Sequence, residues 1–173
     1  MADDEYIVRE EVWEKYGVFL DTASDRKLVT ELNLADKGIA DLTPLAKLTS
    51  LTKLDLYKNQ ITDLTPLTML VRLEELGLGS NQITDLTPLA MLVRLEELGL
   101  GNNQIIDLTP LADLMSLKEL RLYSNDITDL TPLSGLKRLE QLNLEDNPNL
   151  AKAEISNLKK PLPKCGIVHN AIQ

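Results

Sequence analysis

One repeat length, 22 residues, limits what this chain can fold into. The segment VRLEELGLGSNQITDLTPLAML at 71–92 returns at 93–114 with only three changes. Looser copies occupy 49–70 and 115–136, a degraded copy occupies 27–48, and an incomplete copy runs over 137–150. A fixed period of this length is typical of solenoids, in which each repeat packs only against its neighbours. We therefore predict six stacked repeats over 27–150.

Within each copy, the pattern LxxLxLxxNxI predicts a short strand followed by a tight turn. Leu54 and Leu56 are expected to point inward, since successive strand side chains point to opposite faces. The turn after the strand carries an asparagine in five copies. An amide both donates and accepts hydrogen bonds, so these side chains are predicted to bond the loop backbones of the repeats above and below them. The members of this asparagine ladder are Asn59, Asn81, Asn103, Asn125 and Asn147.

The second half of each copy, DLTPLxxL, predicts one turn of helix on the outer side. In the copy at 49–70, Thr65 is expected at the N-cap and Pro66 at the first helical position, where its missing N–H costs nothing. Too few residues follow for a longer helix, so a 3₁₀ turn is expected. The aspartate of each copy is expected to form an Asx turn rather than to bind metal. These aspartates are Asp41, Asp63, Asp85, Asp107 and Asp129.

The segment 1–26 is expected to cap the N-terminal end of the stack. A terminal layer without a cap would expose its leucines and its unpaired strand groups. Apolar spacing predicts a helix over 4–16, followed by a strand at 18–20. We expect 16–34 to form a hairpin that covers the first edge of the sheet.

The segment 151–173 is expected to cap the other end. A helix is predicted over 151–160, with Ile155 and Leu158 as its buried positions. The short apolar run at 165–168 predicts a strand that covers the far edge of the sheet.

Composition limits the partners that this chain is expected to have. The net charge is −9, and such a surface repels nucleic acid and anionic membranes while it favours basic partners. The single cysteine, Cys165, permits no internal disulfide, and the acidic start MADDEYIVREE is unlike a secretory signal. No apolar run reaches transmembrane length. The expectation is a cytoplasmic monomer that binds a protein or peptide, with no nucleic acid and no membrane among its partners. A processed secreted form is the alternative that the sequence leaves open.

No group of residues predicts catalysis, metal binding or a cofactor. His169 is the only histidine, and nothing in the sequence orients it with Cys165 as a base and a nucleophile. Cys165 is instead expected to be a small buried residue of the cap. No cluster has the spacing of zinc ligands, and the glycines of the central repeats lie within predicted strands rather than in a phosphate-binding loop. We therefore expect a protein that is not an enzyme and has no cofactor.

Stacking the repeats places equivalent outward side chains about 5 Å apart, in three columns across the sheet. The first column is Glu31, Lys53, Glu75, Glu97, Glu119 and Gln141. The second is Asn33, Asp55, Gly77, Gly99, Arg121 and Asn143, and the third is Ala35, Tyr57, Gly79, Gly101, Tyr123 and Glu145. The two central repeats thus present four glycines between two tyrosines, beside three glutamates in a file that repel one another.

This arrangement predicts a shallow trough that takes a basic, extended segment of a partner, with the tyrosines as its walls. The alternative is an ordinary solvated face, in which one glycine pair was duplicated together with its repeat. The predicted partner-binding residues are Tyr57, Glu75, Gly77, Gly79, Glu97, Gly99, Gly101, Glu119, Arg121 and Tyr123.

The 22-residue pattern LxxLxLxxNxIxDLxPLxxL over 27–150 resembles the bacterial internalin-like class of leucine-rich repeats. The resemblance implies an α/β right-handed solenoid with a parallel concave sheet, short 3₁₀ or helical turns on the convex side, and helical caps at both ends. The segment 16–34 also resembles the N-cap of plant-type repeat proteins without its cysteines.

Members of this class bind protein partners on the concave face, so the resemblance implies a non-catalytic protein-binding module. Two alternatives remain open. Near-identical repeats also suit an engineered or consensus scaffold with no native ligand. Phosphatase-regulating relatives suggest, by analogy, a regulatory subunit of an enzyme.

Overall fold

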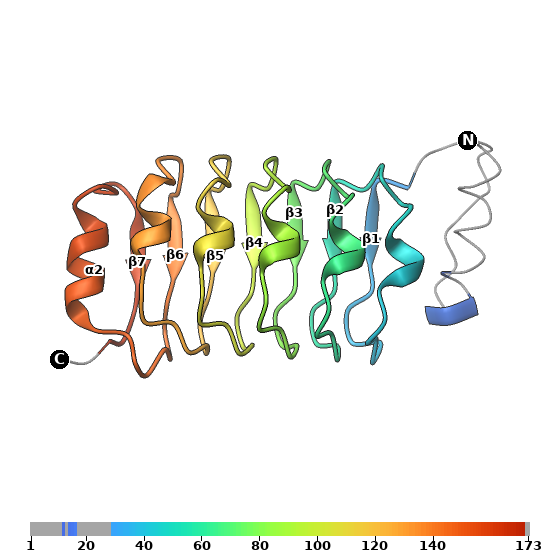
Figure 1. Ribbon diagram of the computed structural model, residues 1–173, viewed down its shortest axis with the longest axis horizontal. Helices are drawn as coiled ribbons and strands as arrows, with labels where there is room; N and C mark the ends of the chain where they lie inside the picture. Colours follow the sequence, from blue (N-terminus) through green and yellow to red (C-terminus); the bar gives the residue numbers. More distant parts are fainter. Residues whose placement is uncertain (1–11, 13, 17–28, 172–173) are drawn as a thin grey trace.

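The computed structural model describes residues 12, 14–16 and 29–171. Strands and helical turns alternate along one row, from β1 to the C-terminal helix α2 (Figure 1). The strands are β1 (Glu31–Asn33), β2 (Lys53–Asp55), β3 (Glu75–Gly77), β4 (Glu97–Gly99), β5 (Glu119–Arg121), β6 (Gln141–Asn143) and β7 (Gly166–Val168). The helical elements are η1 (Thr43–Leu45), η2 (Thr65–Leu67), η3 (Thr87–Leu89), η4 (Thr109–Leu111), η5 (Thr131–Gly135) and α2 (Lys152–Lys159).

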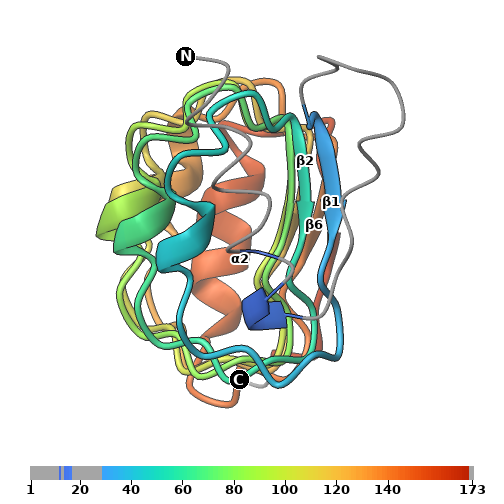
Figure 2. The ribbon, with the colours of Figure 1, turned by 90° about the vertical axis from the view of Figure 1, so that its right-hand side faces the viewer.

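The seven strands form one parallel sheet in the order of the sequence. Partners on neighbouring strands of the repeats are 22 residues apart, as in the pairs Leu54–Leu76 and Leu76–Leu98. Viewed along the row, the sheet lies on one side and the 3₁₀ turns lie on the other (Figure 2). The predicted solenoid with a parallel sheet and short outer turns is confirmed.

The core lies between the sheet and the turns, and each repeat contributes one layer of aliphatic side chains. In the repeat of β4, Leu95, Leu98 and Leu100 are fully buried. The predicted inward positions Leu54 and Leu56 are 2% and 0% exposed. Burying one such side chain stabilises the fold by roughly 1.5–3 kcal/mol. The leucine layers therefore provide most of the driving force for stacking.

The asparagine ladder connects each repeat to the one before it. The Oδ1 atom of Asn81 accepts the backbone N–H of Ile61 at 3.0 Å. Its Nδ2 atom donates to the carbonyl of Leu56 at 3.1 Å and to that of Leu78, in its own repeat, at 2.9 Å. The predicted structural role of the asparagines is confirmed. The bonds run only within the repeat and to the preceding repeat, however, and not to both neighbours as expected.

The carbonyl acceptors of this ladder are shared between successive asparagines, whereas the N–H donors are not. The carbonyl of Leu100 accepts from both Asn103 and Asn125, at 3.0 Å each. The N–H of Ile105 donates to Asn125 alone among the hydrogen bonds of the described residues, also at 3.0 Å. Losing one asparagine therefore leaves an N–H without a partner while the carbonyls keep one.

The predicted Asx turns are present in all five copies of the DLTPL segment. The carboxylate of Asp63 accepts the backbone N–H of Thr65 at 2.8 Å, and the other four copies repeat this bond. Bonds from the Thr65 hydroxyl and N–H hold the pKa of Asp63 below its usual range. The expected N-cap was wrong by one residue: Leu64 is the N-cap and Thr65 begins η2. The N–H groups of Leu67 and Thr68, which a threonine cap would serve, bond instead to the carbonyls of Leu64 and Thr65.

A left-handed residue precedes the ladder position in every repeat, and no pattern in the sequence predicted it. These residues have φ between 53° and 56°, although none of them is glycine. Side chains other than glycine adopt this region at a cost, least so for Asn and Asp. The six residues are Asp36, Lys58, Ser80, Asn102, Ser124 and Asp146.

At the N-terminal end, Val12 is fully buried and joins the core of the repeats. Val12 and residues 14–16 are helical, in agreement with the end of the helix predicted over 4–16. Tyr16 donates its hydroxyl to the carbonyl of Asp41 at 2.5 Å, and Lys15 forms an ion pair with the Asp41 carboxylate. The strand predicted at 18–20, and most of the predicted hairpin, lie outside the described residues.

At the C-terminal end, the predicted helix and strand are both present. Helix α2 buries Ile155 and Leu158 as expected. Strand β7 pairs in parallel with β6 and so extends the sheet by one strand beyond the repeats. Neither α2 nor any other helix among the described residues is long and apolar enough to cross a membrane.

Candidate functional site

The strand register places the outward side chains in the predicted columns. Glu75 lies beside Glu97, and Gly77 lies beside Gly99, across the β3–β4 pair. The third column lies just beyond the strands. There the residue after each member bonds to the next member, as the N–H of Lys58, which follows Tyr57, does to the carbonyl of Gly79 at 2.8 Å. The chain therefore presents the three predicted columns of side chains on one face of the sheet.

The three columns line a groove of about 520 Å³ on the open face of the sheet. Nine of the ten predicted binding residues line it, and Glu119 does not. Seven lining residues were missing from the predicted set, six of them on β1 and β2, and the columns contain all of the seven except three leucines. The full lining is Glu31, Leu32, Asn33, Lys53, Leu54, Asp55, Tyr57, Glu75, Leu76, Gly77, Gly79, Glu97, Gly99, Gly101, Arg121 and Tyr123.

The four central glycines differ in their surroundings. Gly77 and Gly99 end β3 and β4, whereas Gly79 and Gly101 lie beyond the strands, so the prediction that all four are strand residues was wrong for two. Among the described glycines only Gly38 has a positive φ, so backbone conformation does not require glycine at these four positions. Their role depends on what occupies the space above them.

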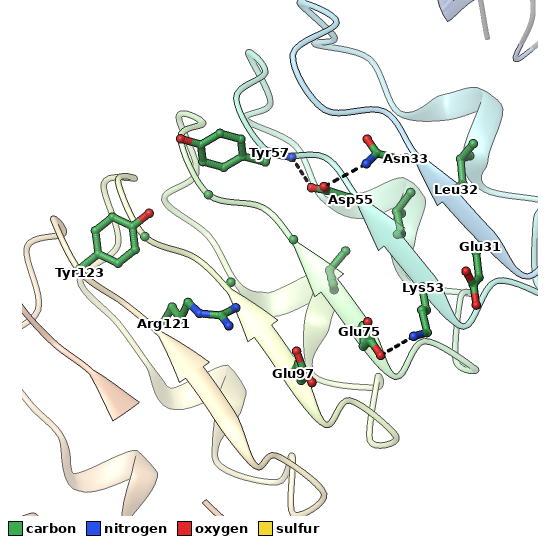
Figure 3. A pocket seen from close by; sticks show the side chains of 16 residues that line it. Glu31, Leu32, Asn33, Lys53, Asp55, Tyr57, Glu75, Glu97, Arg121 and Tyr123 are labelled. Carbon is green, nitrogen blue, oxygen red and sulfur yellow. Dashed lines mark hydrogen bonds and ion pairs between the residues drawn. The ribbon is translucent and has the colours of Figure 1, made fainter. Parts of the chain in front are cut away.

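The two tyrosine rings occupy the space above Gly79 and Gly101. A Cβ atom added at Gly79 would lie 3.2 Å from the ring of Tyr57, and one added at Gly101 would lie 2.3 Å from the ring of Tyr123. Figure 3 shows the two rings directed toward one another from opposite ends of the glycine floor. Gly79 and Gly101 therefore make room for the tyrosine walls, whereas Gly77 and Gly99 form the floor between them. The Asp55 carboxylate lies over Gly77, with its Oδ1 atom 2.9 Å from an added Cβ, and the space above Gly99 is open.

Alanine substitution is expected to distinguish these two kinds of glycine. At Gly99 the nearest atom to an added Cβ is 3.8 Å away, so alanine fits there. Gly99→Ala is expected to raise the free energy of unfolding by about 0.5 kcal/mol, because alanine lowers the conformational entropy of the unfolded chain. Gly101→Ala must displace the Tyr123 ring and is expected to lower this free energy by about 1 kcal/mol. Urea denaturation measures both. Equal effects of the two changes would contradict the ring packing.

The glutamate file is less repulsive than the sequence predicts, because two of its three members have ion-pair partners. Glu75 pairs with Lys53 at 2.7 Å, and Glu119 pairs with Arg121 at 2.5 Å. The hydrogen bond that Lys53 donates to Glu75 raises the pKa of the Lys53 ammonium group above its usual value. Glu97 is exposed and forms no ion pair with any described residue. The uncompensated charge of the file is thus concentrated at its centre.

Besides Glu97, Asp55 is a second carboxylate of the groove that forms no ion pair with any described residue. Its Oδ1 atom accepts the backbone N–H of Tyr57 at 3.0 Å, and its Oδ2 atom accepts from the amide of Asn33 at 3.4 Å. Neither partner carries a positive charge. The groove lining contains four carboxylates against Lys53 and Arg121, so its charge is −2.

The groove lining offers binding contacts, and the described residues in it include no histidine, cysteine, serine or threonine. Cys165, discussed above as a residue of the cap, is buried as predicted, and this burial raises the pKa of its thiol. Phenol rings, carboxylates and exposed backbone are the groups that the groove presents. They suit recognition of another chain, because aromatic and charged groups contribute most to protein interfaces.

Repeated strands, outer turns and an asparagine ladder define the class of protein, and comparison with known proteins agrees. The model of the leucine-rich repeats (2 copies) family matches residues 27–69, 71–113 and 116–160. The chain belongs to the leucine-rich repeat family. No curated protein sequence matches it at a significant level.

Among solved structures, the chain is similar to bacterial internalins and is related to them. An internalin (InlF) of Listeria monocytogenes is 38% identical, with a TM-score of 0.77 over 83% of this chain and 43% of that one. Internalin C2 of the same organism is 35% identical, with a TM-score of 0.64 over 82% of this chain and 71% of that one. A leucine-rich repeat protein of Leptospira interrogans is 36% identical, with a TM-score of 0.75 over 80% of this chain and 36% of that one. The chain therefore spans less than half the length of two of these three proteins.

Proposed function

We propose that the groove binds an extended, basic segment of a protein partner, and that the protein acts by binding rather than by catalysis. The observation that carries this proposal is a lining with an excess of negative charge around an open glycine floor. Negative grooves attract basic segments and speed their association. Leucine-rich repeat proteins are generally protein-interaction modules, which supports the same role.

The shape of the groove supports an extended segment rather than a globular surface. Gly77 and Gly99 lie on adjacent strands, so the open floor is about 5 Å between their Cα positions. Tyr57 and Tyr123 are three strands apart, or about 14 Å, at the edge of this floor. A strand of polypeptide, which takes about 5 Å of width, fits this floor. A helix with its side chains is about 10 Å across and would meet the tyrosine rings, which lean inward over Gly79 and Gly101.

Filling the floor is expected to abolish binding. Gly99→Gln adds a neutral side chain at an open position, so the fold is expected to be kept. The matched control is Thr84→Gln, at an exposed position outside the groove. Proteins captured from a lysate of the source cell by cross-linking are quantified for wild type and both variants. We expect at least about tenfold less of a basic partner with Gly99→Gln and no change with Thr84→Gln.

Ionic strength provides a second criterion for the same partner. Attraction between exposed charges weakens as salt shortens the screening length. The wild-type complex is therefore expected to form more slowly at high salt. A partner held equally by Gly99→Gln and Thr84→Gln, or one whose association is independent of salt, would refute binding in the groove.

A further inference from the structure

We infer, building on the proposed function, that the groove recognises one arginine side chain of its partner, seated over Gly77. Gly77 is the point of the floor nearest to an aromatic ring and to two carboxylates that form no ion pair with any described residue. No other described floor position combines these three groups.

Asp55 supplies the first carboxylate. It is the direct neighbour of Gly77 on β2, and its Oδ1 atom lies 2.9 Å from the position that a Cβ atom of Gly77 would occupy. The carboxylate thus leans over the floor rather than away from it. A side chain at position 77 would collide with this carboxylate, so glycine allows the carboxylate to lie over the floor.

Glu97 supplies the second carboxylate, on the other side of Gly77. It lies on the next strand and two residues away along the strand, or about 8 Å between Cα atoms. Unlike Glu75 and Glu119, it has no cationic partner among the described residues. A cation above Gly77 would therefore interact with two carboxylates, neither of which has to give up an ion pair.

The ring of Tyr57 supplies a flat apolar wall. It packs at Gly79, which lies two residues, or about 7 Å, from Gly77 on the same chain. Arg121 occupies the opposite end of the floor and repels a second cation there (Figure 3). This asymmetry assigns the cation to the β2 end of the groove.

A guanidinium group fits these surroundings better than an ammonium group. It is planar, it stacks on aromatic rings, and it donates to carboxylates through several N–H groups at once. An ammonium group is a compact, strongly hydrated charge that cannot stack flat on the tyrosine ring. The inferred selectivity is therefore arginine over lysine, and either over an uncharged isostere.

The test uses a blocked alanine pentapeptide with arginine at its centre and ¹⁵N-labelled full-length protein. Backbone amide shifts are followed by NMR while the peptide is added, up to about 10 mM. We expect saturable shifts at Gly77 and Gly79. The same peptide with lysine is expected to bind about threefold more weakly, and the peptide with neutral citrulline to cause no saturable shift.

Two groove variants and one matched control locate the contact. Glu97→Gln and Tyr57→Leu are each expected to lower the affinity of the protein for the arginine peptide about threefold. Glu140→Gln removes the same charge at an exposed position outside the groove and is expected to change nothing. Equal effects of Glu97→Gln and Glu140→Gln would mean that only the overall charge matters.

Absence of saturable shifts, or equal shifts with citrulline, would overturn the arginine site. These outcomes do not overturn the proposed function, because that is tested by the loss of a protein partner in Gly99→Gln. If Gly99→Gln leaves the partner bound while the arginine peptide still shifts Gly77, the proposed function fails and the cation site stands.

Discussion

Leu98→Ala is expected to lower the free energy of unfolding by about 4 kcal/mol. Leu98 is 0% exposed and lies in β4, with Leu76 and Leu120 as its neighbours on the adjacent strands. Layers on both sides prevent the structure from collapsing into the space that the lost atoms leave. The cost is therefore the lost burial together with an unfilled cavity directly beneath the groove.

Urea denaturation followed by circular dichroism measures this effect. Val93→Ala, in the same repeat but 50% exposed, is the matched control and is expected to change stability by less than about 0.5 kcal/mol. Repeats contact only their neighbours, so a central defect also tends to split the array, and a smaller denaturant slope is expected in Leu98→Ala. A loss below about 1 kcal/mol would show that the layers repack around the missing side chain.

Asn125→Ala is expected to lower the free energy of unfolding by about 3 kcal/mol. Asn125 is 4% exposed and is the only described partner of the Ile105 N–H. The carbonyls of Leu100 and Leu122 keep bonds from Asn103 and Asn147. One buried donor without a partner, together with the space left by the amide, accounts for the expected loss.

The same change at Asn103 tests this explanation. Asn103 accepts the Ile83 N–H at 3.0 Å, but this bond is only partly buried. Water is expected to replace the lost partner there, so Asn103→Ala is expected to cost about 1 kcal/mol. Thermal or urea denaturation of both variants gives the comparison. A larger loss at Asn103 than at Asn125 would contradict the unpaired-donor account.

The fold could be predicted because its constraints recur at every turn of the stack. Each copy repeats the inward leucines, the ladder asparagine and the Asp-Leu-Thr-Pro turn, so errors in one copy are corrected by the others. Register followed directly: a 22-residue period makes Leu76 the neighbour of Leu98. The family resemblance added the right-handed winding of the solenoid and the internalin-like class of its repeats, and the comparisons bear out this class.

The details of the groove were harder to predict because they depend on side-chain direction and not on period. The columns placed Tyr57 next to Gly79 but did not tell us that the ring leans over the glycine. They aligned three glutamates but did not show that Lys53 neutralises Glu75. Side chains longer than one strand spacing choose among several neighbours, and sequence spacing alone does not select one of them.

The left-handed residues illustrate a different limit. Lys58 and Ser80 have φ of 56° without being glycine or asparagine, so no residue type marks the conformation. The stacked turn imposes it, since the neighbouring N–H groups must meet the ladder asparagine. Tertiary hydrogen bonding overrides the local preference of these residues.

The near-identical copies at 71–92 and 93–114 also act as a spacer between the tyrosine walls. Each copy brings its own leucine layer and ladder asparagine, so adding or removing one leaves every junction in the stack equivalent. The distance between Tyr57 and Tyr123 therefore changes only in steps of one strand spacing, about 4.8 Å. An array built in this way can adjust the width of its groove by whole repeats, while the chemistry of the two walls is unchanged.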